Sequence, residues 1–227
     1  MKPPFIKECG LFNLPTCINN VESLCLVPHV LLHEEEYKRF GTEKSPGTKM
    51  ISVGGNVNKP GAFEIEFGMT LREIIYGLAG GVSGGREIAL IQTGGASGKI
   101  ASSAVLDTPY TYEDLRKVGL TVGSGAILVV DERTSVIDFL CMTQQFFSHE
   151  SCGQCTPCRE GNRHIKRLLG LIQSDEHTKK DIQIIEKYAK IMRNSSLCGL
   201  GESAQNALLA AMDQFPQVFE TVGEGEN

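Results

Sequence analysis

Cys152, Cys155 and Cys158 follow one another at C-x2-C-x2-C spacing, and a fourth cysteine, Cys198, comes much later in the chain. Three thiolates at this spacing can bind one face of a cuboidal iron–sulfur cluster, and a remote fourth thiolate supplies the last corner. Zinc more often takes two separated C-x2-C pairs, although a C-x2-C-x2-C run can also donate three ligands to zinc. The spacing therefore favours a [4Fe–4S] cluster, with zinc as the alternative. A disulfide framework is disfavoured because the chain opens without a signal peptide.

The residues after the cysteine run predict a helix that begins at or just after Cys158 and extends over 159–172. Its apolar residues recur at steps of three and four, which places them on one face: Ile165, Leu168, Leu169 and Ile172. Such a helix directs its N-terminal N–H groups towards the thiolates. Arg159 either adds a positive charge beside them or is an ordinary solvated arginine in the first turn. His149 is either an ordinary residue at a helix C-terminus or a group that hydrogen-bonds near the cluster or replaces a ligand.

Residues 132–222 predict an all-α unit, and one helix cannot carry all four cysteines. Apolar periodicity predicts four helices, the number in a small bundle, over 135–149, 159–172, 181–192 and 202–212. Such a bundle would fix the distance between the loop at 152–158 and Cys198. Residues 223–227 are predicted to be a disordered tail.

Residues 47–131 predict a compact unit with a mixed sheet, so that the whole chain belongs to the α+β class. Thr70 and Glu73 form a capping box for a helix that ends near Gly80. Strand signals lie over 49–53, 62–67, 88–92 and 126–130. A hairpin, a helix across the sheet and a final buried strand are typical of a ubiquitin-like β-grasp domain.

Residues 1–46 contain too little apolar sequence to fold alone, so this segment is predicted to be the tail of a larger domain. The stretch 22–32 predicts a helix that Pro28 kinks or restarts. The other cysteines show no ligand spacing and are interpreted as ordinary thiols: Cys9, Cys17, Cys25 and Cys141.

Composition excludes several classes of function. The net charge is −5 and no dense block of Lys and Arg occurs, so nucleic-acid binding is not expected. No apolar run approaches the roughly 20 residues that cross a bilayer, so direct membrane insertion is not expected. These features predict a soluble protein of a reducing compartment, either the cytoplasm or the matrix side of an organelle, alone or peripheral in a complex.

The stretch from His149 to Gly161, together with Cys198-Gly-Leu-Gly, resembles the iron–sulfur domain of the NADH-binding flavoprotein subunit of respiratory complex I. The same domain recurs in NAD-linked hydrogenase and formate dehydrogenase subunits. The resemblance covers the C-terminal portion of that family. Residues 47–131 are similar to its soluble-ligand-binding β-grasp domain. The stretch from Lys2 to Pro28, which includes Pro15 to Ser23, is similar to the end of its flavin-binding domain.

The resemblance implies that Cys152, Cys155, Cys158 and Cys198 bind a [4Fe–4S] cluster that receives single electrons from flavin mononucleotide (FMN) reduced by NADH. It further implies a partial FMN site formed by Ile18, Asn19, Asn20 and Glu22, because amides and carboxylates can hydrogen-bond flavin or ribityl oxygens. From the residues alone, Asn19-Asn20 can equally be a turn before a helix.

The glycine-rich flavin and NADH region of that family is not found in this sequence. The segments 80–85 and 94–98 do not lie between a strand and a helix and are interpreted as flexible connections. FMN and NAD are therefore expected only where another chain or a missing segment completes the site, and the chain alone should not oxidise NADH. The expected partners are flavin-bearing and iron–sulfur subunits of an oxidoreductase complex. The competing hypothesis is a non-redox adaptor or assembly module stabilised by zinc.

Overall fold

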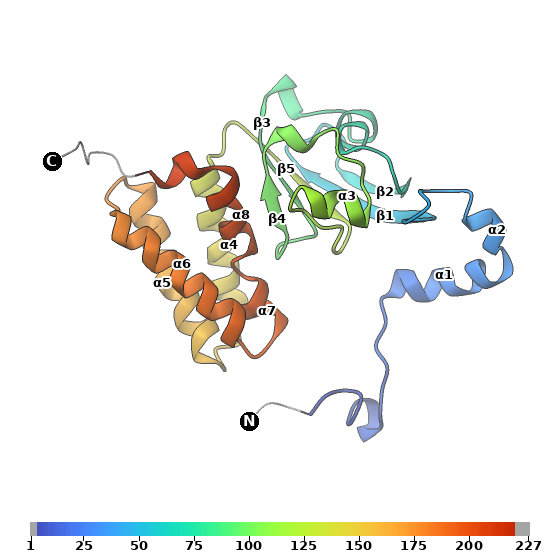
Figure 1. The fold of residues 1–227 in the computed structure, drawn as a ribbon, viewed down its shortest axis with the longest axis horizontal. Helices are drawn as coiled ribbons and strands as arrows, with labels where there is room; N and C mark the ends of the chain where they lie inside the picture. Colours follow the sequence, from blue (N-terminus) through green and yellow to red (C-terminus); the bar gives the residue numbers. More distant parts are fainter. Residues whose placement is uncertain (1–3, 221–227) are drawn as a thin grey trace.

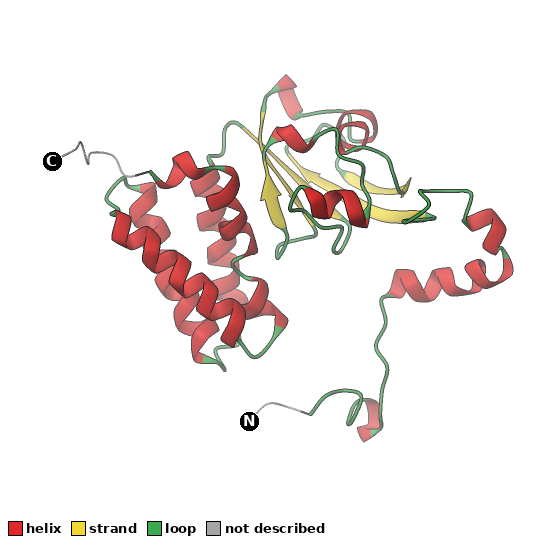
Figure 2. Cartoon of the chain, viewed as in Figure 1, coloured by secondary structure: helices red, strands yellow, loops and turns green. Residues whose placement is uncertain are grey.

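The computed structural model describes residues 4–220 and arranges them in three parts (Figures 1 and 2). An N-terminal segment with helices α1 (Val21–Leu32) and α2 (Glu34–Tyr37) extends away from the rest of the chain. A five-stranded sheet lies in the middle, and a group of helices lies beyond it. The predicted tail at 223–227 lies outside the described residues.

The central sheet has the strand order β2-β1-β5-β3-β4. Its strands are β1 (Thr48–Gly55), β2 (Gly61–Glu66), β3 (Ile88–Thr93), β4 (Lys99–Ala101) and β5 (Ala126–Asp131). β1 and β5 pair in parallel, with Ser52 opposite Ala126, and the other neighbours pair antiparallel. Four of these strands were predicted within a few residues. β4 was missed, because only three residues follow the glycine turn at 94–98.

The predicted capping box is present, but the helix that follows is not a regular α-helix. Glu73 N donates to Thr70 Oγ1 at 3.1 Å, and Thr70 N donates to Glu73 Oε2 at 2.8 Å. The segment Glu73–Leu78 then adopts π-helical geometry, a wider coil that occurs mostly in short stretches. A second helix of this unit, α3 (Tyr112–Lys117), was not predicted and is capped by Thr111.

Up to residue 220, the last one described, the helical part contains five α-helices where four were predicted. They are α4 (Val136–Glu150), α5 (Thr156–Gln173), α6 (Lys179–Ser195), α7 (Gly199–Ser203) and α8 (Asn206–Gln214). The helix predicted over 202–212 is divided, because the backbone of Gln205 (φ −103°, ψ 9°) leaves helical geometry between α7 and α8. α5 begins earlier than predicted, with Cys155 as its N-cap, so Cys158 lies inside the first turn.

The sheet separates two hydrophobic cores. Side chains of a strand alternate between its faces, so Ile91 packs with one core while Leu90 packs with the other. The first core contains the π-helix and α3 residues; the second contains residues of α4, α5, α6 and α8. This double burial explains why β5 is apolar on both faces. Asn206 Nδ2 also donates to Ser97 O at 2.9 Å, which joins α8 to the turn before β4.

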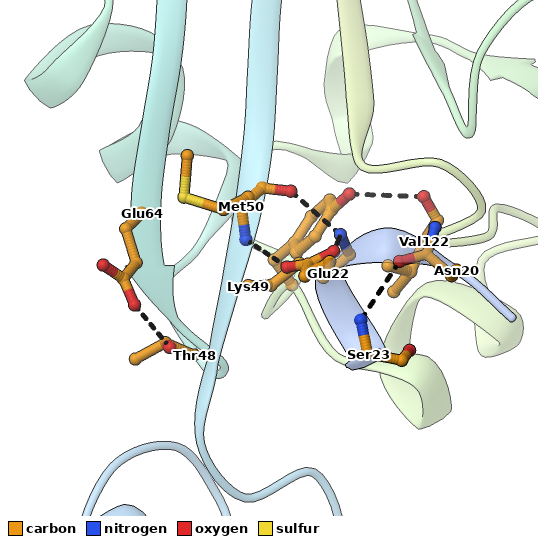
Figure 3. A network of polar contacts seen from close by, with 9 residues as sticks. Asn20, Glu22, Ser23, Thr48, Lys49, Met50, Glu64 and Val122 are labelled. Atoms are coloured by element: carbon orange, nitrogen blue, oxygen red, sulfur yellow. Dashed lines mark hydrogen bonds and ion pairs between the residues drawn. The ribbon is translucent and has the colours of Figure 1, made fainter. Parts of the chain in front are cut away.

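The N-terminal segment is attached to the sheet by Glu22 (Figure 3). One carboxylate oxygen accepts a hydrogen bond from Met50 N at 2.8 Å, and the other forms an ion pair with Lys49. Lys49 Nζ also donates to Met50 O at 2.9 Å. No residue of α1 is buried, and most of its apolar side chains are exposed. Among the described residues, no helix combines the length and apolar character that a membrane span requires.

Removing a buried side chain from α5 tests the second core. Ile165 is fully buried, so Ile165→Ala should lower the free energy of unfolding by about 2–5 kcal/mol through lost contacts and a residual cavity. The matched control Lys166→Ala changes an exposed neighbour and should stay within about 0.5 kcal/mol. Chemical denaturation of both variants measures the difference, and equal stabilities would contradict this description of the core.

Removing the Glu22 carboxylate should release α1 from the sheet. A hydrogen bond to a charged group contributes about 1.5–3 kcal/mol, so Glu22→Ala should speed amide hydrogen exchange in α1 by roughly tenfold to a hundredfold. Glu35→Ala is the control, because Glu35 is an exposed first-turn acid of α2. Unchanged exchange in α1 of Glu22→Ala would show that the carboxylate does not hold the segment.

Candidate metal centre

Two loops at the same end of the helical part carry the four motif cysteines. Cys152 and Cys155 lie in the connection between α4 and α5, and Cys158 lies in the first turn of α5. Cys198 is the N-cap of α7, just after the end of α6. The sharp turn after Cys152 requires Gly153, whose φ of +73° is unfavourable for other residues.

The four thiols share one electrostatic environment. Burial raises the pKa of Cys158, and the neighbouring thiols Cys155, Cys198 and Cys152 raise it further by like-charge repulsion, while Ser151 opposes the shift. Cys158 is buried, Cys155 is partly buried, and Cys152 and Cys198 are exposed. The structure therefore places the four predicted cysteines near enough to one another that the other three influence the pKa of Cys158.

Backbone N–H groups from both loops lower the pKa of Cys155. The N–H of Leu197 is the main cause of its lowered pKa, followed by those of Cys158 and Cys155, while burial opposes the effect. Leu197 directly precedes Cys198, so this contact joins the two cysteine loops. Hydrogen bonds of this kind favour the thiolate, the form that binds metals.

α7 packs so closely against the end of α6, and also against α5, that position 201 must be glycine. A Cβ on Gly201 would lie 2.4 Å from Ser196 Oγ and 3.0 Å from the Cβ of Cys158. The Ser196 hydroxyl is buried, helps to lower the pKa of Cys155, and forms no hydrogen bond to another group within residues 4–220. Four thiols, converging N–H groups and this buried hydroxyl form a donor set that fits an anionic iron–sulfur group.

Arg159 holds the first cysteine loop in place. Its Nη1 donates to Gly153 O at 2.6 Å, and its Nε donates to Glu160 Oε1 at 2.8 Å. The hydrogen bond from Arg159 keeps the pKa of Glu160 below its usual range. The guanidinium thus lies beside the cysteines, as the sequence suggests, and it also fixes the loop backbone.

His149 is not placed as a ligand. Its side chain is 83% exposed, and its described contact is with Glu150, at 3.3 Å. Across residues 4–220, no three His, Cys, Asp or Glu side chains converge closely enough to hold a single metal ion.

The structure places the four residues predicted to contact flavin at the start of the N-terminal helix. Ile18 and Asn19 are exposed in an extended stretch, and Asn20 is the N-cap of α1, where its Oδ1 accepts from Ser23 N at 3.3 Å (Figure 3). Glu22 is bound to β1. A flavin-lining role remains a prediction for all four, and two of them already have structural roles.

The site also contains residues that the sequence interpretation missed. Ser151 and Ser196 flank the cysteine loops, and Asn162 donates its amide N–H to Cys158 Sγ at 3.4 Å. Asn162 could have been found, because it lies four residues after Cys158 on a predicted helix and therefore on the same face. No sequence signal points to the Leu197 N–H.

Two regions of the chain match known protein families. Residues 138–222 match the family described as the NADH-ubiquinone oxidoreductase-F iron-sulfur binding region, and residues 50–101 match the SLBB domain. The chain therefore contains an iron–sulfur binding region and an SLBB domain, and the resemblance expected from the sequence is confirmed.

Particular relatives cover nearly the whole chain. It is 36% identical over 220 residues to the NADH-quinone oxidoreductase F 2 subunit of Rhizobium meliloti (strain 1021), covering 96% of the chain and 52% of that protein. It is 33% identical to the HndC subunit of the NADP-reducing hydrogenase of Solidesulfovibrio fructosivorans, covering 96% and 45%. The chain thus spans about half the length of the curated relatives it matches.

A solved structure has the same fold. The crystal structure of an NAD+-reducing [NiFe]-hydrogenase in the H2-reduced state superposes with a TM-score of 0.84 at 28% identity, covering 99% of this chain and 38% of that one.

Adding a methyl group at Gly201 tests the close approach of α7 to α5. Gly201→Ala should push α7 away from Cys158, cost about 1–3 kcal/mol of stability and reduce bound iron severalfold. Gly199→Ala is the matched control, because nothing lies within 4 Å of its added Cβ in the same helix. Iron analysis and thermal unfolding of the two variants measure the effect. Equal iron content in both would contradict the packing described here.

Proposed function

We propose that Cys152, Cys155, Cys158 and Cys198 bind a [4Fe–4S] cluster, which relays single electrons within an NADH-linked flavin and iron–sulfur oxidoreductase. The observation that carries this proposal is the gathering of four thiols and several N–H donors from two separate loops. These loops lie within the region that matches the iron–sulfur family.

The bound cluster would supply reversible storage of one electron. Four cysteine ligands leave no open coordination position for substrate, so this chain's residues control the electron's energy and do not activate a substrate. The Leu197 N–H stabilises negative charge on Cys155. Arg159 places a positive charge beside the loop, and burial of Cys158 excludes water from one corner.

The sheet unit and N-terminal segment fit the rest of such an assembly. The order β2-β1-β5-β3-β4, with a helix crossing one face, supports a ubiquitin-like β-grasp domain at 47–131 followed by an iron–sulfur helical bundle at 132–222. Ile18 and Asn19 are exposed and free to line part of an FMN site at the end of a flavin-binding domain. NADH oxidation then requires another segment or chain, and the partners are flavin-bearing and iron–sulfur subunits.

The alternative function is an adaptor stabilised by zinc. Metal analysis distinguishes it from an electron relay that carries an iron–sulfur cluster. The full chain, purified without oxygen, should contain about four iron and four acid-labile sulfide per chain and absorb broadly in the visible range. One zinc per chain without sulfide would overturn the cluster proposal and favour the adaptor.

Replacing single cysteines tests the assignment of the ligands. Each of four variants removes one thiolate from the cluster: Cys152→Ser, Cys155→Ser, Cys158→Ser and Cys198→Ser. The content of iron and sulfide should fall severalfold in each of them. Cys141→Ser is the control, because Cys141 lies on α4 and contacts Gln173, and its metal content should be unchanged. A motif variant that keeps its full iron and sulfide would remove that cysteine from the ligand set.

A further inference from the structure

Three buried amide side chains form a hydrogen-bonded network that reaches the sulfur of Cys158. Asn162 Nδ2 lies 3.4 Å from Cys158 Sγ, and both residues lie on α5, four positions apart. The Asn162 side chain is 1% exposed, so water does not compete for this contact. Among the described residues, Asn162 is the one whose side-chain amide donates a hydrogen bond to a cysteine of the motif.

Two glutamines determine which way the Asn162 amide faces. Its Oδ1 accepts from Gln144 Nε2 at 2.7 Å and from Gln205 Nε2 at 3.2 Å. Gln144 belongs to α4 and Gln205 lies between α7 and α8, and both side chains are buried. With its oxygen bound on that side, the amide can present only its N–H groups to the sulfur. A thiolate can only accept, so the reverse orientation would place two electron-rich atoms against each other.

A hydrogen bond to a ligand sulfur acts on the reduced cluster more strongly than on the oxidised one. Reduction adds one negative charge that is shared with the thiolates, and a charge-assisted hydrogen bond strengthens as its acceptor becomes more negative. Hydrogen bonds to the sulfurs are among the groups that set cluster potentials. Ser151 Oγ lies 3.3 Å from the same sulfur, so Asn162 supplies one of two side-chain contacts.

We propose that Asn162, fixed by Gln144 and Gln205, is a positioning residue that raises the reduction potential of the cluster through its N–H···S contact with Cys158. This inference rests on the proposed cluster. It also assigns a role to the break between α7 and α8, since that break carries Gln205 to the network.

The test is an EPR-monitored redox titration of the full chain carrying its cluster. Asn162→Leu removes the donor at similar volume, and at a fixed solution potential its ratio of reduced to oxidised cluster should fall about three- to tenfold. That change corresponds to a potential about 30–60 mV lower for a one-electron couple. Asn194→Leu, the same change at an exposed site on α6, should titrate like the unaltered chain.

The glutamines are tested separately. Gln144→Met removes one of the bonds that fix the amide and should lower the ratio in the same direction by a smaller factor, while the exposed neighbour variant Gln145→Met should not. A purely structural role would change how much cluster is bound but not the potential of the cluster that remains. Equal potentials in Asn162→Leu and the unaltered chain would overturn the proposal.

A measurement on the unaltered chain tests the contact even if the Asn162→Leu variant does not fold. Asn162→Leu removes Oδ1 as an acceptor for both glutamines, and a buried N–H that loses its acceptor costs about 1–3 kcal/mol. Gln144 Nε2 keeps Asn162 O and Gln205 Nε2 keeps Met192 Sδ as acceptors. If that variant does not fold, pulsed EPR on the unaltered chain with 15N-amide asparagine decides. A nitrogen coupling to the reduced cluster supports the contact, and its absence overturns it. An unaltered chain without iron and sulfide would instead refute the proposed function.

Discussion

The structure depends on holding four like-charged sulfur groups in one place. Four thiolates repel one another, and each neighbouring thiol raises the pKa of Cys158. The chain offsets this repulsion with N–H donors: Leu197 to Cys155, Asn162 to Cys158, and the first turn of α5. Bound iron would supply the remaining positive charge. The two cysteine loops can therefore lie side by side only if the N–H donors and the cysteines are positioned together.

Helix packing supplies that placement. α5 brings Cys158 and Asn162 onto one face, while α6 delivers Ser196 and Leu197 to the same end. The absence of a side chain at Gly201 lets α7 approach Cys158 within van der Waals distance. The interruption at Gln205 weakens the regularity of the last helix, but it brings an amide into the buried network. The local irregularity thus places the Gln205 amide N–H against Asn162 Oδ1.

The sheet links this site to the rest of the chain. Its two faces belong to different hydrophobic cores, so β3 and β5 are packed from both sides. β1 in turn holds the N-terminal segment through Glu22 (Figure 3). That segment exposes much apolar surface in this chain, as is expected of a surface that is covered in a larger protein or complex.

The sequence by itself determined the chemistry and most of the secondary structure. The spacing of Cys152, Cys155 and Cys158, with the distant Cys198, predicts the donor set, because ligand type and local spacing can be read directly from the chain. Apolar periodicity located α4, α5 and α6 and four of the five strands. Only the tertiary structure decided which N–H groups face the sulfurs, that Glu22 binds β1, and that Gln144 and Gln205 meet at Asn162. These contacts join residues far apart in sequence, and their geometry follows from packing, which no local pattern encodes.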